Sequence, residues 1–193
     1  KSEQANLDPN NAYGKTKLSS ENLFLKWFNS NPIGKSCVIL RPSVIYGDNN
    51  YANMYNLMKL LSSFFPILVG NGNYVKSMIS LNNLIDITHF CVNNIKGLEI
   101  FNCTDEPYPK LNEIIDFICS VEGFNKPFIN IPYNFALLLA KPFDLFSKFT
   151  NIDIGITSER VYKFATPTDF RSDKLRAFGY IQKYDTKEEI IKM

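Results

Sequence analysis

The sequence predicts an α/β protein, and three features indicate that class. Between residue 10 and about residue 29, apolar residues recur at helical spacing, and we expect this apolar face to pack against a core; it comprises Leu23, Phe24, Trp27 and Phe28. A short apolar strand, Cys37–Leu40, then runs without polar alternation, as in a parallel sheet that is covered on both faces. Helical and strand-like segments go on alternating along the rest of the chain, which is typical of α/β architecture.

Length and composition narrow the classes of function. The chain has 193 residues, enough for one medium domain or a domain and a half, and its 45% hydrophobic content is that of an ordinary globular protein. The net charge is +2 and the basic residues are scattered, so we expect no nucleic-acid partner. The longest apolar stretch, residues 135–140, is far shorter than the ~20 residues that a bilayer requires, so we expect no membrane span.

Cysteine and histidine usage argues against a metal site. Four cysteines lie singly in apolar surroundings, and the chain has one histidine, His89. Zinc sites need such residues in clusters, so we expect no metal. We interpret the cysteines as buried, reduced thiols, and because no signal peptide is recognised we expect a cytoplasmic protein.

A tyrosine and a lysine at the start of the first helix form the main candidate site. Tyr13 and Lys17 are one turn apart on the same helical face. A free phenol titrates near ~10, and a nearby ammonium lowers that value toward the range in which a base is useful. Tyr55 and Lys59 repeat this spacing without a buried strand after them, so the spacing alone also fits an exposed helix face.

The strand after this helix ends in Leu40-Arg41-Pro42-Ser43-Val44-Ile45-Tyr46-Gly47. Ligands of open α/β sheets bind beyond the carboxyl ends of the strands. The segment from Pro42 to Gly47 occupies that position, so we expect it to border the same site as Tyr13 and Lys17.

Several of these segments together resemble the extended short-chain dehydrogenases/reductases, the NAD-dependent epimerase/dehydratase family. Asn11–Lys17 with Glu21 is similar to the Tyr-Gly-x-Ser/Thr-Lys-x-x-x-Glu signature of that family, and Leu40–Gly47 is similar to its following strand. Phe101-Asn102 and Leu175–Tyr180 are similar to later family segments. The resemblance implies part of a Rossmann-like parallel sheet plus a smaller α/β substrate-binding lobe.

The resemblance also implies roles for single residues. Tyr13 would be the acid/base on a sugar hydroxyl or keto group, and Lys17 would lower the pKa of Tyr13 and bind the nicotinamide ribose of NAD or NADP. Backbone near Pro42 and Val44 would contact the nicotinamide. The substrate would be a nucleotide-linked sugar, a precursor of cell-surface polysaccharide.

Three residues are candidates for substrate contacts. Asn49 lies in a polar loop, residues 48–53. Lys76 stands where the family often has an arginine on the diphosphate, although an ordinary surface lysine fits equally well. Arg171 could contact phosphate or belong to a solvated cationic face.

The sequence leaves the reaction type open. Many nucleotide-sugar epimerases have asparagine at the position of Val44, and Pro42 is more like the reductase branches, so a 4-epimerase and a 4-keto reductase are not separated. A member that binds a nucleotide or a partner without turnover is a further alternative.

The predicted lobes interleave along the chain. Residues 1–47 and 83–105 are assigned to the dinucleotide-binding domain, and residues 48–82 and 106–193 to the substrate-binding lobe. The sequence has no Gly-x-x-Gly-x-x-Gly turn, so we expect the C-terminal portion of a longer enzyme, inactive when isolated.

Three further expectations concern single segments. The resemblance suggests a homodimer through the helix that carries Tyr13, in which Trp27 would lie at the interface rather than in the core. We interpret Asp105 and Glu106 as solvated, and residues 156–164 as a cationic helix.

Overall fold

The structure is a computed structural model that describes residues 1–9, 11–51, 53–150, 158, 161–162 and 166–193. The chain forms two compact units that interleave in sequence, each of which is described by itself below. The first unit comprises Lys1–Asn49, Ser77–Pro107 and Asp169–Met193, and the second comprises Asn50–Lys76 and Tyr108–Thr168.

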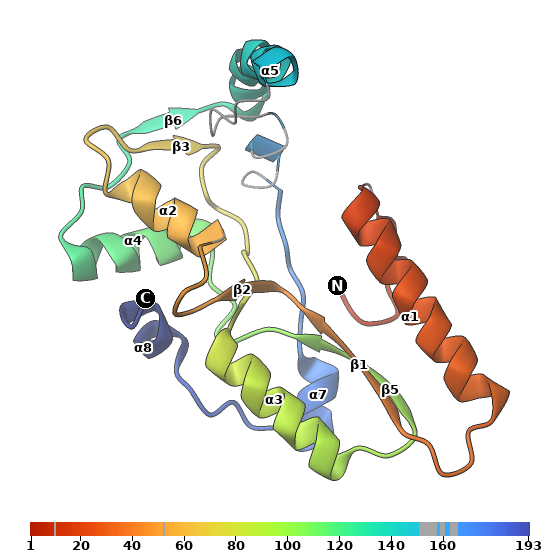
Figure 1. The fold of residues 1–193 in the computed structure, drawn as a ribbon. Coiled ribbons are helices and arrows are strands. Elements are labelled where there is room, and N and C mark those ends of the chain that lie inside the picture. Colours follow the sequence, from red (N-terminus) through yellow and green to blue (C-terminus); the bar gives the residue numbers. More distant parts are fainter. Residues whose placement is uncertain (10, 52, 151–157, 159–160, 163–165) are drawn as a thin grey trace. The chain divides into compact units, whose positions relative to one another are not determined.

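The first unit is built on parallel strands (Figure 1). Its elements are α1 (Ala12–Ser30), β1 (Cys37–Pro42), β2 (Val44–Tyr46), β4 (Met78–Ser80), α3 (Leu81–Asn94), β5 (Leu98–Cys103), α7 (Asp173–Ala177) and α8 (Thr186–Ile191). β1 pairs in parallel with β5, in a register that runs from Cys37 opposite Leu98 to Pro42 opposite Cys103. β2 continues from β1 and pairs in parallel with β4. These parallel pairs confirm the predicted α/β class.

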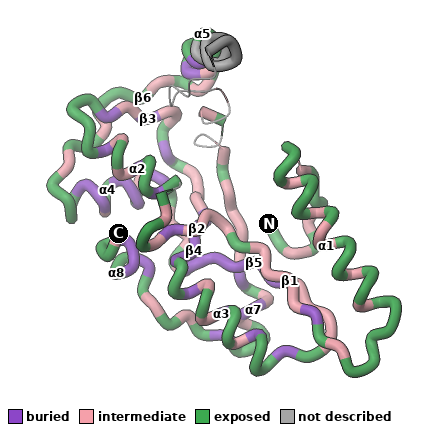
Figure 2. The backbone as a smooth tube through the Cα atoms, viewed as in Figure 1, coloured by how far each residue is buried: buried purple, intermediate pink, exposed green. Residues whose placement is uncertain are grey.

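The core of the first unit lies between the sheet, α3 and the C-terminal segment. Ile79, Ile87, Phe101 and Leu175 are each at most 2% exposed. Figure 2 shows the buried stretch of backbone that passes through β4 and the end of β5. All four cysteines are free and buried, as predicted from their apolar surroundings.

The second unit is a smaller α/β assembly. Its elements are α2 (Asn53–Leu61), β3 (Ile67–Val69), α4 (Leu111–Glu122), β6 (Ile129–Ile131) and α5 (Tyr133–Thr150). β3 pairs in parallel with β6. α2 and α4 contact each other and bury apolar faces, with Leu57 of α2 and Ile118 of α4 at most 2% exposed. Gly123 ends α4 at a φ of 69°, a left-handed conformation that glycine adopts without strain.

The prediction that the apolar residues of α1 face a core was wrong. α1 has no buried residue, and Leu23, Phe24 and Trp27 are 66%, 58% and 48% exposed. Among the described elements, β1 is the one with which α1 makes its principal contact. The face of α1 that carries Leu23, Phe24 and Trp27 is therefore exposed.

The two units divide the chain differently from the predicted lobes at 77–82 and 169–193, both of which fold with the first unit. The reason lies in their contacts. β4 pairs with β2, and Leu175 of α7 is fully buried in the core of the first unit. The Ser77 hydroxyl and the backbone of Phe170 also exchange hydrogen bonds. Most of the predicted cationic helix at 156–164 lies outside the described residues.

None of the helices in the described part of the chain has both the length and the apolar character needed to cross a bilayer.

Candidate functional site

The candidate pair lies in the first turns of α1. The Asn11 side chain caps the helix by accepting a hydrogen bond from the backbone N–H of Gly14 at 2.8 Å. This cap fixes the start of the helix, so Tyr13 and Lys17 lie one turn apart on one face. The Lys17 Nζ lies 5.5 Å from the centroid of the Tyr13 ring. In this chain the Tyr13 side chain is 72% exposed.

The first unit has a crevice of about 360 Å³ whose lining includes Lys17 but not Tyr13. It is bordered by the N-terminal segment, the start of α1 and the carboxyl end of β1, and its lining includes Gly14, Lys17, Glu21, Arg41, Pro42 and Asn102. Lys17 and Pro42 therefore share one crevice at the end of a parallel strand, where ligands of α/β sheets bind.

An ion pair joins α1 to the end of β1 at this crevice. The guanidinium of Arg41 binds the Glu21 carboxylate with two nitrogens, and the Nε–Oε2 distance is 3.1 Å. The side chains of Arg41 and Glu21 are only 19% and 13% exposed. A further nitrogen of Arg41 donates to the backbone carbonyl of Glu3 at 2.8 Å. Arg41 therefore ties the N-terminal segment, α1 and β1 together.

The other predicted cofactor and substrate residues of the first unit lie outside the lining of this crevice. Val44 is half-buried in β2, opposite Met78 of β4. Asn49 is exposed and has a φ of 59°, in the left-handed region. The Nε of Arg171 donates to Oδ1 of Asp169 at 2.7 Å.

Lys76 belongs to the second unit and is half-buried there. Its ammonium donates to the backbone carbonyl of Thr166 at 3.1 Å. Burial lowers the pKa of Lys76 below its ordinary value. Of the three predicted substrate residues, Asn49 and Arg171 thus lie in the first unit and Lys76 in the second.

Asp105 was predicted to be solvated, and that prediction was wrong, because the side chain is 2% exposed. Its Oδ2 accepts hydrogen bonds from the Tyr46 hydroxyl at 2.9 Å and from the Ser80 backbone N–H at 2.8 Å. Its Oδ1 accepts from the Asn83 side chain at 2.9 Å. Burial raises the pKa of Asp105 to about 6.

Comparison with curated proteins finds relatives among sugar epimerases. The chain is 33% identical, over 92% of its length, to the N-acetyl-alpha-D-glucosaminyl-diphospho-ditrans,octacis-undecaprenol 4-epimerase of Escherichia coli O157:H7, and it covers 54% of that protein. It is 30% identical, over 52% of its length, to a UDP-glucose 4-epimerase of Vibrio cholerae, of which it covers 30%. The chain thus spans at most about half the length of these relatives. No family model matches it.

Solved structures share the fold. A UDP-glucuronic acid 4-epimerase from Bacillus cereus, in complex with NAD and a fluorinated UDP-sugar, has a TM-score of 0.68 at 17% identity. A dTDP-glucose 4,6-dehydratase from Bacillus anthracis in complex with NAD has a TM-score of 0.65 at 16% identity. Both matches cover 99% of this chain, and they cover 54% and 53% of the two solved chains.

The sequence relatives are epimerases, and the solved neighbours with the same fold are epimerases and dehydratases. The curated relatives are epimerases of the NAD-dependent epimerase/dehydratase family of extended short-chain dehydrogenases/reductases, and this chain is similar to them over at most about half of their length.

Proposed function

We propose that this chain supplies the acid/base half of an NAD- or NADP-dependent 4-epimerase or 4-keto reductase that acts on a diphosphate-linked sugar. The observation that carries the proposal is the position of Lys17. Its ammonium lies over the Tyr13 ring and also lines the crevice that contains Pro42. The relatives and the fold support the same assignment.

The chemistry follows from the two side chains. A nicotinamide bound in the crevice would accept a hydride from the sugar carbon or deliver one to it. Tyr13 would take the proton of the sugar hydroxyl as that oxygen becomes a carbonyl, and return it in the reverse step. Lys17 would stabilise the tyrosinate form of Tyr13, which accepts that proton and becomes the neutral phenol, and it would bind the ribose hydroxyls. Pro42, which lines the crevice, would border the nicotinamide, whereas Val44 could reach it only from outside the lining of the crevice.

The residues present fit only the nicotinamide end of such a cofactor. The crevice offers an ammonium, a strand end and the Asn102 amide. The glycine-rich turn that holds the pyrophosphate in this family does not occur in the sequence. We therefore propose that this chain alone binds NAD weakly and does not turn over substrate.

The carrier of the sugar has two candidates. A nucleotide is the carrier in the name of the Vibrio cholerae relative, and diphospho-undecaprenol is the carrier in that of the Escherichia coli relative. The match to the Escherichia coli relative is longer, 180 residues against 102. This difference is the reason for keeping diphospho-undecaprenol as a second candidate beside the nucleotide. Asn49, Lys76 and Arg171 remain our proposed contacts to the substrate.

The test uses the complete natural polypeptide that carries this sequence, with Tyr13→Phe as the variant. Turnover is measured with UDP-N-acetylglucosamine and with N-acetylglucosaminyl-diphospho-undecaprenol. Loss of ~100-fold or more is expected, because general acid/base catalysis contributes ~10²–10⁴. Unchanged turnover would remove Tyr13 from the mechanism. Binding without turnover in the unaltered protein would favour the non-catalytic alternative. Tyr55→Phe, at the second Tyr-x-x-x-Lys spacing, is the matched control and should retain full activity.

A further inference from the structure

Three phenylalanine side chains meet on the surface of the second unit. Phe64 and Phe65 lie between α2 and β3, and Phe128 directly precedes β6. The ring centroids of Phe64 and Phe65 are 4.5 Å apart and those of Phe65 and Phe128 are 6.2 Å apart, both in edge-on geometry. The three side chains are nevertheless 84%, 60% and 64% exposed. Since phenylalanine has no polar group to place in water, this phenylalanine patch marks a site of interaction.

The first turns of α5 also present large apolar side chains to solvent. Phe135, Leu138 and Leu139 lie on one face of this helix, at spacings of three and four residues, and all three are exposed. Ala136 and Ala140, on another face, are buried. An ordinary surface helix turns its larger apolar residues inward, so α5 has the reverse arrangement. Figure 1 shows that α5 follows directly on β6, the strand that begins beside the phenylalanine patch.

The segments that carry these apolar residues have only positively charged side chains. Residues 53–69, from α2 through β3, and residues 123–142, from the end of α4 into α5, contain three lysines, no arginine and no acidic residue. The three lysines, all exposed, are Lys59, Lys126 and Lys141. Lys126 forms an ion pair with Asp116 of α4, in which both side chains stay mostly exposed. Apolar rings beside ammonium groups are the combination that binds the surface of an anionic bilayer.

We propose that the phenylalanine patch and the exposed face of α5 bind the surface of a lipid bilayer that contains anionic lipids. The choice of a bilayer rests on the proposed function. A sugar carried by diphospho-undecaprenol is anchored in a bilayer by its polyprenyl chain, so an enzyme that acts on it has to reach the membrane surface. The rings enter the boundary between headgroups and acyl chains, and the lysines contact the lipid phosphates. Binding of this kind needs no helix that crosses the membrane.

A protein partner, including a second copy of this chain, is the competing occupant. Protein interfaces are enriched in arginine and depleted in lysine relative to the rest of a protein surface. Residues 53–69 and 123–142 have the opposite preference, since they contain lysine and no arginine. We therefore assign this surface to lipid, and the experiment below distinguishes the two occupants.

Co-sedimentation with vesicles tests the inference on the complete natural polypeptide that carries this sequence. The vesicles consist of phosphatidylethanolamine with a quarter of phosphatidylglycerol, and no sugar substrate is present. The unaltered protein should sediment with them, and the double variant Phe64→Ser with Phe65→Ser should bind at least tenfold more weakly. No binding by the unaltered protein, or equal binding by the double variant, would overturn the inference.

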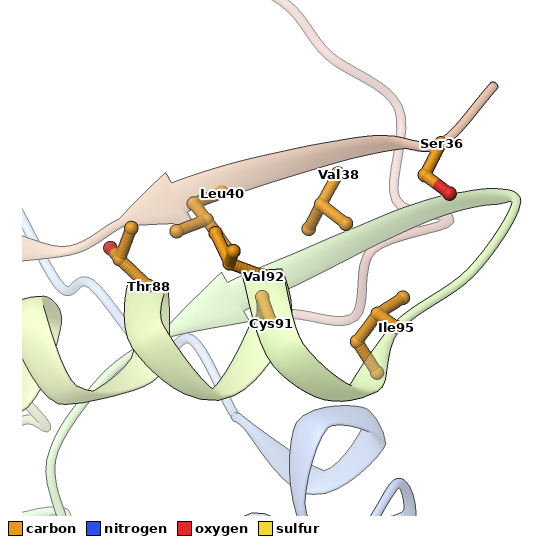
Figure 3. Close-up of a pocket in the computed structure, with 7 residues that line it drawn as sticks. All are labelled: Ser36, Val38, Leu40, Thr88, Cys91, Val92 and Ile95. Carbon is orange, nitrogen blue, oxygen red and sulfur yellow. The ribbon is translucent and has the colours of Figure 1, made fainter.

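A matched control removes two exposed apolar side chains elsewhere. Tyr51 precedes α2, whereas the phenylalanine patch follows it, and Val92 of α3 borders a groove in the first unit (Figure 3). These side chains are 71% and 73% exposed, close to the exposure of the two phenylalanines. Tyr51→Ser with Val92→Ser should therefore bind the vesicles as the unaltered protein does. An equal loss in both double variants would show that the phenylalanine patch is not the docking surface.

Two further measurements separate lipid binding from other causes. Lys59→Gln with Lys126→Gln should weaken binding to the anionic vesicles by roughly fivefold for each lysine, and should leave binding to vesicles of phosphatidylcholine alone unchanged. Self-association without lipid that is lost in the double phenylalanine variant would assign the patch to a second copy and would overturn the inference. Tyr13→Phe should bind the vesicles normally, so a failure of membrane binding and a failure of the catalytic proposal give different results.

Discussion

The hydroxyl of Tyr46 donates a hydrogen bond of 2.9 Å to the carboxylate of Asp105, and both side chains are buried in the first unit. Tyr46 also lies 3.3 Å from the backbone carbonyl of Thr186, in the first turn of α8. This cluster links β2, the end of β5 and the C-terminal helix. Because Asp105 is a buried acid whose pKa is raised, it makes the stability of the first unit depend on pH.

We predict that the free energy of unfolding decreases as the pH rises from about 4 to about 6. Burial raises the pKa of Asp105 to about 6 in the folded chain, above its ordinary value of 3.8. The folded state thus binds the proton more tightly than the unfolded state. The resulting stabilisation is fully present below pH ~4 and is lost as the pH passes through the folded pKa. About two pKa units correspond to about 3 kcal/mol at most.

Urea denaturation at a series of pH values measures this slope. Asp105→Asn should flatten the curve between pH 4 and 6, since the amide does not titrate. Asp48→Asn, which alters an exposed carboxylate of the same unit, should leave the slope as it is. A slope that persists in Asp105→Asn would show that other groups cause it.

Tyr46→Phe should have two effects that can be measured separately. It removes a hydrogen bond in a fully buried site, which typically costs about 1–3 kcal/mol when the acceptor stays unsatisfied. It also removes a bond that lowers the pKa of Asp105, so the midpoint of the pH-dependent loss should move to higher pH. Urea denaturation of the variant at pH 4 to 8 gives both values. A lower stability with an unmoved midpoint would contradict the proposed link between the two residues.

Arg41→Lys should destabilise the first unit by about 1–2 kcal/mol. Lysine cannot bind Glu21 with two nitrogens while also donating to the Glu3 carbonyl, because it lacks the planar fork of arginine. Both partners are largely buried, so solvent replaces the lost contacts poorly. Lys126→Arg provides the control, since its ion pair with Asp116 is mostly exposed and should contribute little. Thermal unfolding of both variants measures the two losses of stability. An equal loss in Arg41→Lys and Lys126→Arg would contradict the proposed role of Arg41.

The α/β class and the parallel pairing could be predicted from the sequence because they depend on local patterns. The uninterrupted apolar run at Cys37–Leu40 and the helical spacing before it are such patterns. The burial of Asp105 could not be predicted in this way. It depends on Tyr46, Ser80 and Asn83, which lie 59, 25 and 22 positions away in the chain, so local sequence alone gives no sign of their contact.

For the candidate site and the lobes too, the features set by neighbouring residues could be predicted, and those set by contacts between distant residues could not. Tyr13 and Lys17 could be paired from their spacing, because a helix fixes the relation of residues one turn apart. The return of residues 169–193 to the first unit depends on long-range contacts such as that of Leu175 with the core, so the predicted lobe boundary was displaced there.

The exposed apolar face of α1 yields the last prediction, which concerns the proposed homodimer. Leu23, Phe24 and Trp27 line a shallow apolar depression on α1 together with Ser20. If this face pairs two copies, Phe24→Ser with Trp27→Ser should shift the chain to a monomer in sedimentation velocity experiments. Folding stability should change by less than about 0.5 kcal/mol, as for surface substitutions. Lys26→Ser, an exposed position on the same helix, is the control and should keep the dimer. A monomer in the unaltered protein at all concentrations would remove the proposal, and a dimer that survives the double substitution would move the interface away from α1.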